Sequence, residues 1–62
     1  MRARDAVNLH NGDEVIIKKG NKPVTVNSVN VIYLNPPKTP IVELKVITQG
    51  GAYATVYHDE VR

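Results

Sequence analysis

The feature that most constrains the fold of this chain is a two-residue alternation of branched aliphatic side chains. The clearest case is segment 41–48, in which Val42, Leu44 and Val46 occupy every second position. Successive side chains of a β-strand point to opposite faces, so this spacing predicts a strand with one apolar face. No stretch of the sequence keeps a helical period over ten or more residues. We therefore predict an all-β protein.

The other apolar segments predict a series of short strands separated by turns. The expected strands are 14–19, 24–34, 41–48 and 52–57, with a weaker edge strand at 7–10. Between them lie clusters of glycine, asparagine and proline, which favour tight turns or exposed loops. These clusters are residues 11–12 and 20–23, the proline-rich loop 35–40, and residues 49–51. Residues 58–60 predict a single helical turn.

The longest strand, 24–34, changes phase in its middle. Val24 and Val26 occupy even positions, whereas Val29 and Val31 occupy odd ones. A slip of one residue would turn every later side chain to the other face, so we expect a β-bulge at Asn27–Ser28. Because a sheet this small must hide its edges and bury its apolar rows, we predict a five-stranded small barrel.

Length, charge and cysteine content narrow the class of protein. The chain has 62 residues, a formal net charge of +2 and no cysteine. This length supports one domain, expected at 7–62, with residues 1–6 as either a flexible tail or a short first turn. The lack of cysteine suits the reducing cytoplasm, and no apolar run is long enough to span a membrane. The weak positive charge permits nucleic-acid binding without requiring it.

Residues 12–20, Gly-Asp-Glu-Val-Ile-Ile-Lys-Lys-Gly, are followed by Pro-Val-Thr-Val at 23–26. This run resembles the Gly-Asp-x-Val opening of SH3-like barrels, especially the KOW type of ribosomal proteins and transcription elongation factors. It is also similar to short bacterial and phage domains that open in the same way and have no assigned activity. The resemblance implies an SH3-like barrel and contact with RNA.

The densest positive charge surrounds the turn after the first firm strand. Lys18, Lys19 and Lys22 lie within five positions of one another. Such a group can contact phosphates, with Arg2, Arg4, Lys38 and Lys45 as candidates that extend it. The alternative is a hairpin tip whose lysines keep the protein soluble and block edge-to-edge aggregation.

Three tyrosines are the only aromatic residues. Tyr53 and Tyr57 share one face of their strand, so together they predict a platform on which bases stack, or a contact for a partner. The alternative is a second packed face with the hydroxyls at its rim. Tyr33, next to the proline-rich loop, is a candidate to cap the core or to join this surface.

Other groups give weaker functional signals. His58, Asp59 and Glu60, together with His10, could suggest a metal site, but two histidines without a thiol are a poor ligand set. A barrel of this size has little room for a water-excluding pocket, so we predict no catalytic residue, metal or cofactor. The Pro-x-x-Pro spacing at 37–40 is better explained as a stiff loop than as a ligand for an aromatic groove.

These features predict a non-enzymatic, cytoplasmic binding module that contacts nucleic acid or its machinery. The contacts are expected from Lys18, Lys19, Lys22, Tyr53 and Tyr57. The alternative is a protein-interaction module, such as a phage or bacterial regulator that docks on another protein. A second copy of the chain is a further candidate partner, because a marginal core gains stability from association.

Overall fold

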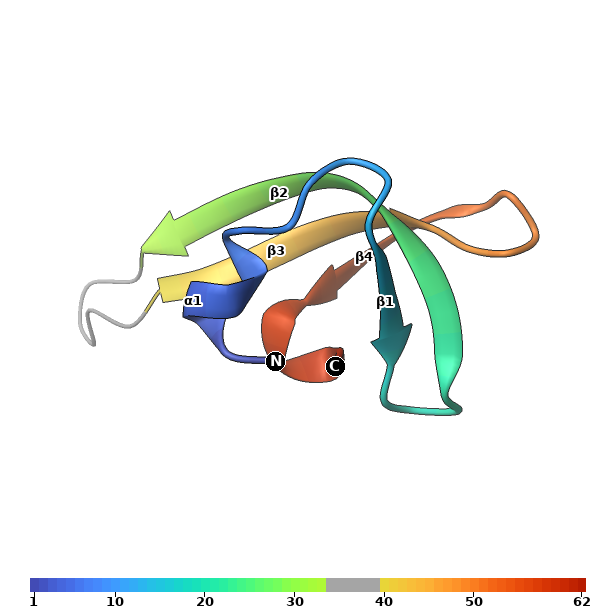
Figure 1. Ribbon diagram of the computed structural model, residues 1–62, viewed down its shortest axis with the longest axis horizontal. Helices are drawn as coiled ribbons and strands as arrows, with labels where there is room; N and C mark the ends of the chain where they lie inside the picture. Colours follow the sequence, from blue (N-terminus) through green and yellow to red (C-terminus); the bar gives the residue numbers. More distant parts are fainter. Residues whose placement is uncertain (34–39) are drawn as a thin grey trace.

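The computed structural model describes residues 1–33 and 40–62. Within them, four strands form one antiparallel sheet in the order β1-β2-β3-β4, so each strand pairs with its neighbour in the sequence (Figure 1). The strands are β1 (Glu14–Ile17), β2 (Lys22–Tyr33), β3 (Pro40–Ile47) and β4 (Tyr53–Tyr57). The prediction of a mostly β protein is confirmed. The proline-rich loop and the Pro-x-x-Pro motif lie outside the described residues except for Pro40, as do Lys38 and the side chain of Tyr33.

β2 bends at the position where the apolar pattern changes phase (Figure 1). Val26 pairs with Val46 and Ser28 with Lys45, which leaves Asn27 as an extra residue on β2. Because of the bulge, side chains before and after it face the same core. Val24 and Val26 before it are buried, and Val29 and Val31 after it pack against the core cluster. The predicted β-bulge is therefore confirmed.

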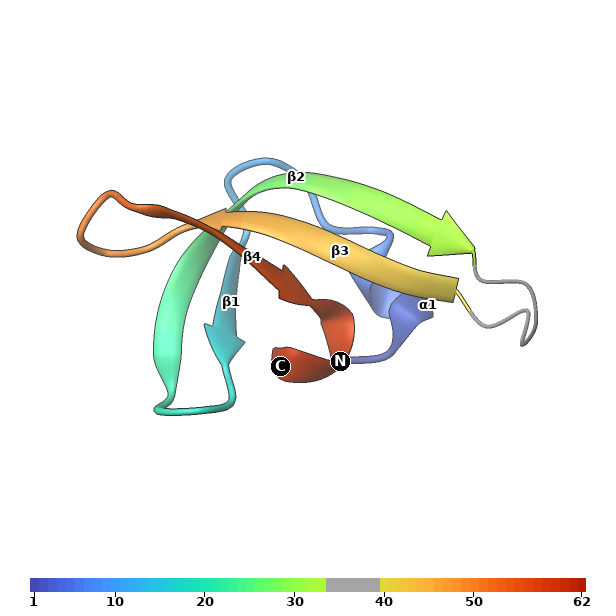
Figure 2. The ribbon, with the colours of Figure 1, turned by 180° about the vertical axis from the view of Figure 1, so that it is seen from behind.

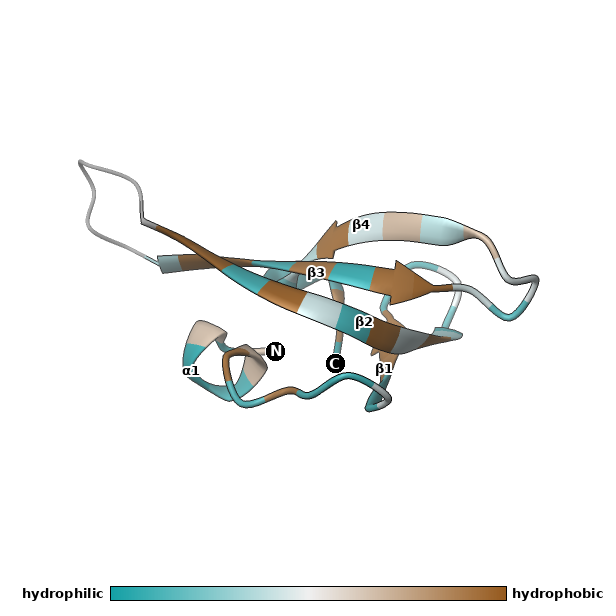
Figure 3. Ribbon diagram, turned by 90° about the horizontal axis from the view of Figure 1, so that it is seen from above, coloured by the Kyte–Doolittle hydropathy of each residue, from teal (hydrophilic) through white to brown (hydrophobic). Residues whose placement is uncertain are grey.

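The core lies on the concave side of the sheet, which also carries α1 (Ala3–Ala6) (Figure 3). Side chains from all four strands alternate into it, as their two-residue spacing predicts. The buried residues are Ala6, Val15, Val24, Val26, Val42, Leu44, Val46, Val56 and Val61. The intervening side chains point to the opposite side, here called the outer face, on which the described residues place no second layer.

The predicted edge strand at 7–10 is wrong. The amides of Val7 and Leu9 donate to the carbonyls of Ala3 and Ala6, each at 3.1 Å, so the backbone continues as a turn after α1. The alternation of Val7 and Leu9 covers too few residues to outweigh this local hydrogen bonding. Ala6 is fully buried, so α1 covers part of the core. None of the helices in the described part of the chain is long and apolar enough to cross a membrane.

The 3-10 helix η1 (His58–Glu60) confirms the helical turn predicted after β4. Beyond it, the chain returns to β1, where Ile17 and Val61 form an isolated bridge (Figure 2). Ile16 donates its amide to the carbonyl of Arg62 at 3.1 Å and accepts the Arg62 amide at 2.9 Å. Among the described residues the sheet has four strands and is not closed, and the fifth strand predicted at 7–10 is not formed.

Candidate functional site

The β1–β2 turn, residues 18–21, carries two of the three predicted lysines at its start. Gly20 and Asn21 have φ angles of +86° and +50°, in the left-handed region that glycine and asparagine tolerate best. The Asn21 amide lies 3.4 Å from the Lys18 carbonyl. The Lys18 amide donates to the Glu60 carbonyl at 2.9 Å, so the segment after β4 holds the start of the turn in place.

The structure brings Lys18, Lys19 and Lys22 together, all exposed, and adds a fourth cation. Arg62 lies beside the same turn, where its guanidinium donates a hydrogen bond to the Asn21 side chain. These four residues are called the basic tip below. Sequence reasoning missed Arg62 because it lies forty-one positions from Asn21. Its place depends on the pairing of the C-terminal segment with β1.

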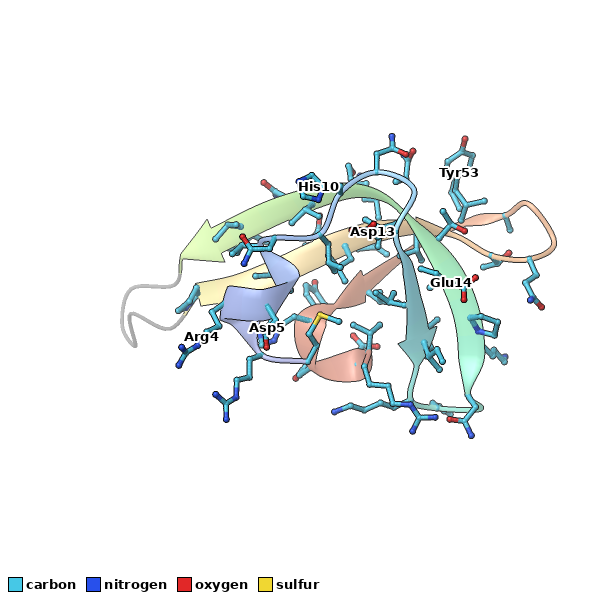
Figure 4. The ribbon with its side chains drawn as sticks, viewed as in Figure 1. Arg4, Asp5, His10, Asp13, Glu14 and Tyr53 are labelled. Atoms are coloured by element: carbon cyan, nitrogen blue, oxygen red, sulfur yellow. The ribbon has the colours of Figure 1, made fainter. Side chains whose placement is uncertain are left out.

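The charge of the basic tip is not neutralised within the described residues. In this part of the chain the single contact at salt-bridge distance between a basic and an acidic side chain joins His10 and Asp13, with the ring nitrogen 3.8 Å from the carboxylate, far from the tip (Figure 4). The nearby Glu60 carboxylate accepts a hydrogen bond from the Tyr57 amide at 3.2 Å. The tip therefore presents cationic groups that can exchange water and counterions for phosphate oxygens.

A hollow of about 400 Å³ borders the basic tip. It lies between the β1–β2 turn and the β3–β4 hairpin, so Lys22 and Asn21 stand on one side and hairpin residues 48–50 on the other. Its remaining walls are Ile17, Pro23 and Val24. A phosphate held by Lys22 would thus lie beside a partly apolar surface.

Of the proposed extensions of the patch, Arg4 and Lys45 lie on other elements, whereas Arg2 follows Met1, whose amino group donates to the carbonyl of Val61, next to Arg62. Arg2 and Arg4 belong to the α1 region at the other end of the molecule from the β3–β4 hairpin (Figure 4). Lys45 is in the middle of β3, where it pairs with Ser28 on one side and Thr55 on the other. All three side chains are exposed. Arg4 and Lys45 therefore lie outside the basic tip.

Tyr53 and Tyr57 share the outer face of β4, with exposed fractions of 75% and 43%. No second layer covers them in the described residues, which favours an exposed surface over the alternative of a second packed face. Figure 4 shows Tyr53 at the top of the molecule and the β1–β2 turn at the bottom. The structure therefore does not bring Tyr53 to the lysines, although the sequence treats the two groups as one candidate site. Tyr57 lies closer to them, because Glu60 accepts the Tyr57 amide with its side chain and the Lys18 amide with its carbonyl.

The histidines serve separate local contacts. The Nδ1 atom of His58 lies 3.0 Å from the Met1 carbonyl, and His10 pairs with Asp13. No group of three or more histidine, aspartate or glutamate side chains gathers anywhere in residues 1–33 and 40–62. The described residues thus offer no set of ligands suited to a metal ion.

Comparisons with protein-family models, with curated proteins and with solved structures find no match to this chain. The resemblance of residues 12–26 to the KOW opening therefore stays a prediction. The functional argument consequently depends on the geometry of the basic tip and of the outer face.

Proposed function

We propose that the protein is a non-enzymatic, cytoplasmic module that binds nucleic acid through the basic tip. The observation that carries the proposal is the convergence of four cations, Lys18, Lys19, Lys22 and Arg62, on one exposed turn, where none of them forms an ion pair within the described residues. Cations held close together gain from releasing the counterions condensed on a phosphate backbone. Contacts of this kind position a protein on nucleic acid without reading its sequence.

The proposed architecture is an SH3-like barrel. Its support is the meander β1–β4, the 3-10 turn that follows it, and the return of Val61 and Arg62 to β1. In such an arrangement the C-terminal segment takes the place of a short fifth strand beside β1. The basic tip then lies at one end of the barrel, where a phosphate backbone can approach without meeting the sheet.

The test is binding of a fluorescently labelled oligonucleotide, followed by anisotropy as the salt concentration rises. Four contacts to duplex DNA predict a slope of log affinity against log salt of about −3.6, at about −0.9 per contact. Replacing Lys18, Lys19 and Lys22 together by glutamine should reduce the slope to about −0.9 and weaken binding at low salt.

A matched control keeps the net charge of the triple variant and places the changes outside the β1–β2 turn. Arg2, Arg4 and Lys45 are exposed, and their combined replacement by glutamine removes the same charge. The control should bind almost as the native protein does. Equal losses in the two variants would show that net charge, rather than the basic tip, determines the affinity.

A second candidate function is docking of another protein on the outer face. The observation that favours it is a hollow of about 290 Å³ lined by Ile32, Ile41, Tyr57, His58 and Asp59. Its apolar walls fit an apolar side chain of a partner protein better than a phosphate. Such binding should survive moderate salt and the triple lysine replacement, and Ile41→Glu should abolish it.

A further inference from the structure

The open edge of β4 has backbone groups that no described residue pairs in the sheet. β4 is the last strand and pairs only with β3. The Thr48 amide donates to the Ala52 carbonyl at 2.8 Å. Hydrogen-bonded pairs alternate along an antiparallel ladder, so Ala54 and Val56 direct their backbone groups toward β3. Those of Tyr53, Thr55 and Tyr57 then face away from the sheet.

An independent hydrogen bond supports this direction. The Tyr57 amide donates to the carboxylate of Glu60 at 3.2 Å instead of to β3. Tyr53 and Thr55 have the same phase as Tyr57, and neither takes part in a backbone hydrogen bond outside the strand ladder among the described residues. The middle of β4 therefore presents donors and acceptors to an approaching strand.

This edge also lacks several of the usual protections against strand pairing. Natural edge strands are commonly blocked by lysine, proline or a bulge. Residues 52–57, Ala-Tyr-Ala-Thr-Val-Tyr, contain no charge and no proline, and β4 pairs with β3 without a register shift. The segment combines aromatic and β-branched residues, which favour strand pairing. Nothing in its own sequence opposes a second strand.

The strand is also complementary to itself. In an antiparallel pair of two β4 strands centred on Thr55, Tyr53 of each copy lies opposite Tyr57 of the other. Ala54 lies opposite Val56 on the core side. Aromatic pairs across strands are favourable, and no like charges meet. A two-fold axis through Thr55 makes the interface identical for both copies.

We propose that a second copy of this chain pairs with the open edge of β4, joining the two sheets into one continuous antiparallel sheet. The Thr55 amide of each copy donates to the Thr55 carbonyl of the other. The strand order places β1 and β4 at opposite edges of each sheet. The proposal does not depend on nucleic-acid binding.

The contact is one short strand on each side, so a weak, concentration-dependent dimer is expected. Sedimentation equilibrium of the full chain from roughly 10 µM to 1 mM covers the range suited to such a small interface. The mass should rise from that of the 6.9 kDa monomer toward twice that value. A monomer at every concentration would overturn the proposal.

Thr55→Pro removes the amide that faces the open edge and leaves the ladder to β3 intact. This variant should be monomeric throughout the range, with its fold checked by circular dichroism. Thr55→Val keeps the amide and should dimerise like the native chain. A dimer that persists in the folded proline variant would contradict strand pairing.

A pair of charge variants tests the register without a change to the backbone. Tyr53→Lys combined with Tyr57→Lys puts like charges opposite each other at both ends and should abolish the dimer. Tyr53→Glu combined with Tyr57→Lys puts opposite charges there and should restore it. Because both tyrosines are exposed, neither variant disturbs the core. Failure of the second variant to dimerise would rule out the Thr55-centred register.

Discussion

The two edges of the sheet differ in cover and in charge. At the β1 edge, the amides of Ile16 and Lys18 donate to the carbonyls of Arg62 and Glu60, so a returning segment covers the strand. The β4 edge has no such cover among the described residues, and the backbone amides and carbonyls of Tyr53 and Thr55 face away from the sheet. The positive charge lies at the covered edge, because the basic tip adjoins β1 and residues 52–57 are uncharged.

This comparison separates two kinds of recognition in one small sheet. A covered edge cannot accept another strand, so the basic tip beside it can attract a phosphate backbone without risk of strand addition. An open, neutral edge attracts no phosphate but can accept a strand. We therefore expect substitutions at the β1 edge to affect phosphate binding and substitutions at the β4 edge to affect strand pairing. A substitution in β3, which supports both edges, should have the largest effect.

The largest expected effect is on β3, which connects the two halves of the sheet. Leu44 is fully buried, so Leu44→Ala leaves a cavity and should lower the free energy of unfolding by about 2–5 kcal/mol. Urea denaturation followed by circular dichroism measures the change. Lys45→Ala, at the next and exposed position, is the control and should change stability by no more than about 0.5 kcal/mol. Equal losses would contradict the assignment of the two faces of β3.

Uncovering the β1 edge should have the next largest effect. Val61 is fully buried, and Val61→Ala should lower the free energy of unfolding by about 2 kcal/mol. The two buried methyl groups that are lost contribute about 0.8 kcal/mol each, and the cavity adds to this. Amide hydrogen exchange at Ile16 and Lys18 should accelerate at the same time. Thr55→Ala at the open edge should leave both quantities almost unchanged. Unchanged exchange at Ile16 in the Val61 variant would show that the C-terminal segment does not cover β1.

The membership of Arg62 in the basic tip gives a smaller and more specific prediction. Arg62→Gln should reduce the salt slope of oligonucleotide binding by about 0.9, as the loss of one phosphate contact requires. Arg4→Gln removes the same charge from α1 and should leave the slope unchanged. Equal slopes in the two variants would remove Arg62 from the candidate site.

The smallest expected effect concerns Glu60, whose carboxylate accepts a hydrogen bond from the Tyr57 amide at the open edge. Glu60→Ala frees the Tyr57 amide of each copy, so self-association should tighten by about twofold to tenfold for each of the two hydrogen bonds gained. Asp59→Ala removes the same charge without that hydrogen bond and serves as the control in sedimentation equilibrium. Weaker association in the Glu60 variant would contradict the proposed role of the edge.

The sequence predicted those parts of the fold that depend on local pattern. The two-residue period located the strands, and the phase change between Val26 and Val29 located the bulge, because a strand must keep one face toward the core. The prediction of an edge strand at 7–10 was wrong because four alternating residues are too few to indicate a strand. The carbonyls of Ala3 and Ala6 instead accept hydrogen bonds that continue the helical turn.

The candidate site was predicted only in part, for a related reason. Lys18, Lys19 and Lys22 are close in sequence, so one turn is enough to bring them together. Arg62 joins them through long-range pairing with β1, which has no local signal. The exposure of Tyr53 depends on whether a second layer covers the outer face, and strand periodicity describes only which side chains share a face.

The most direct test of the central claim is one amide NMR titration of the labelled protein with a short oligonucleotide at low salt, repeated at higher salt. The account predicts salt-sensitive shifts at residues 18–22 and 62, and none at 53–57. Unchanged spectra would contradict nucleic-acid binding. Shifts centred on Tyr53 and Tyr57 would instead assign recognition to the outer face and contradict the role of the basic tip.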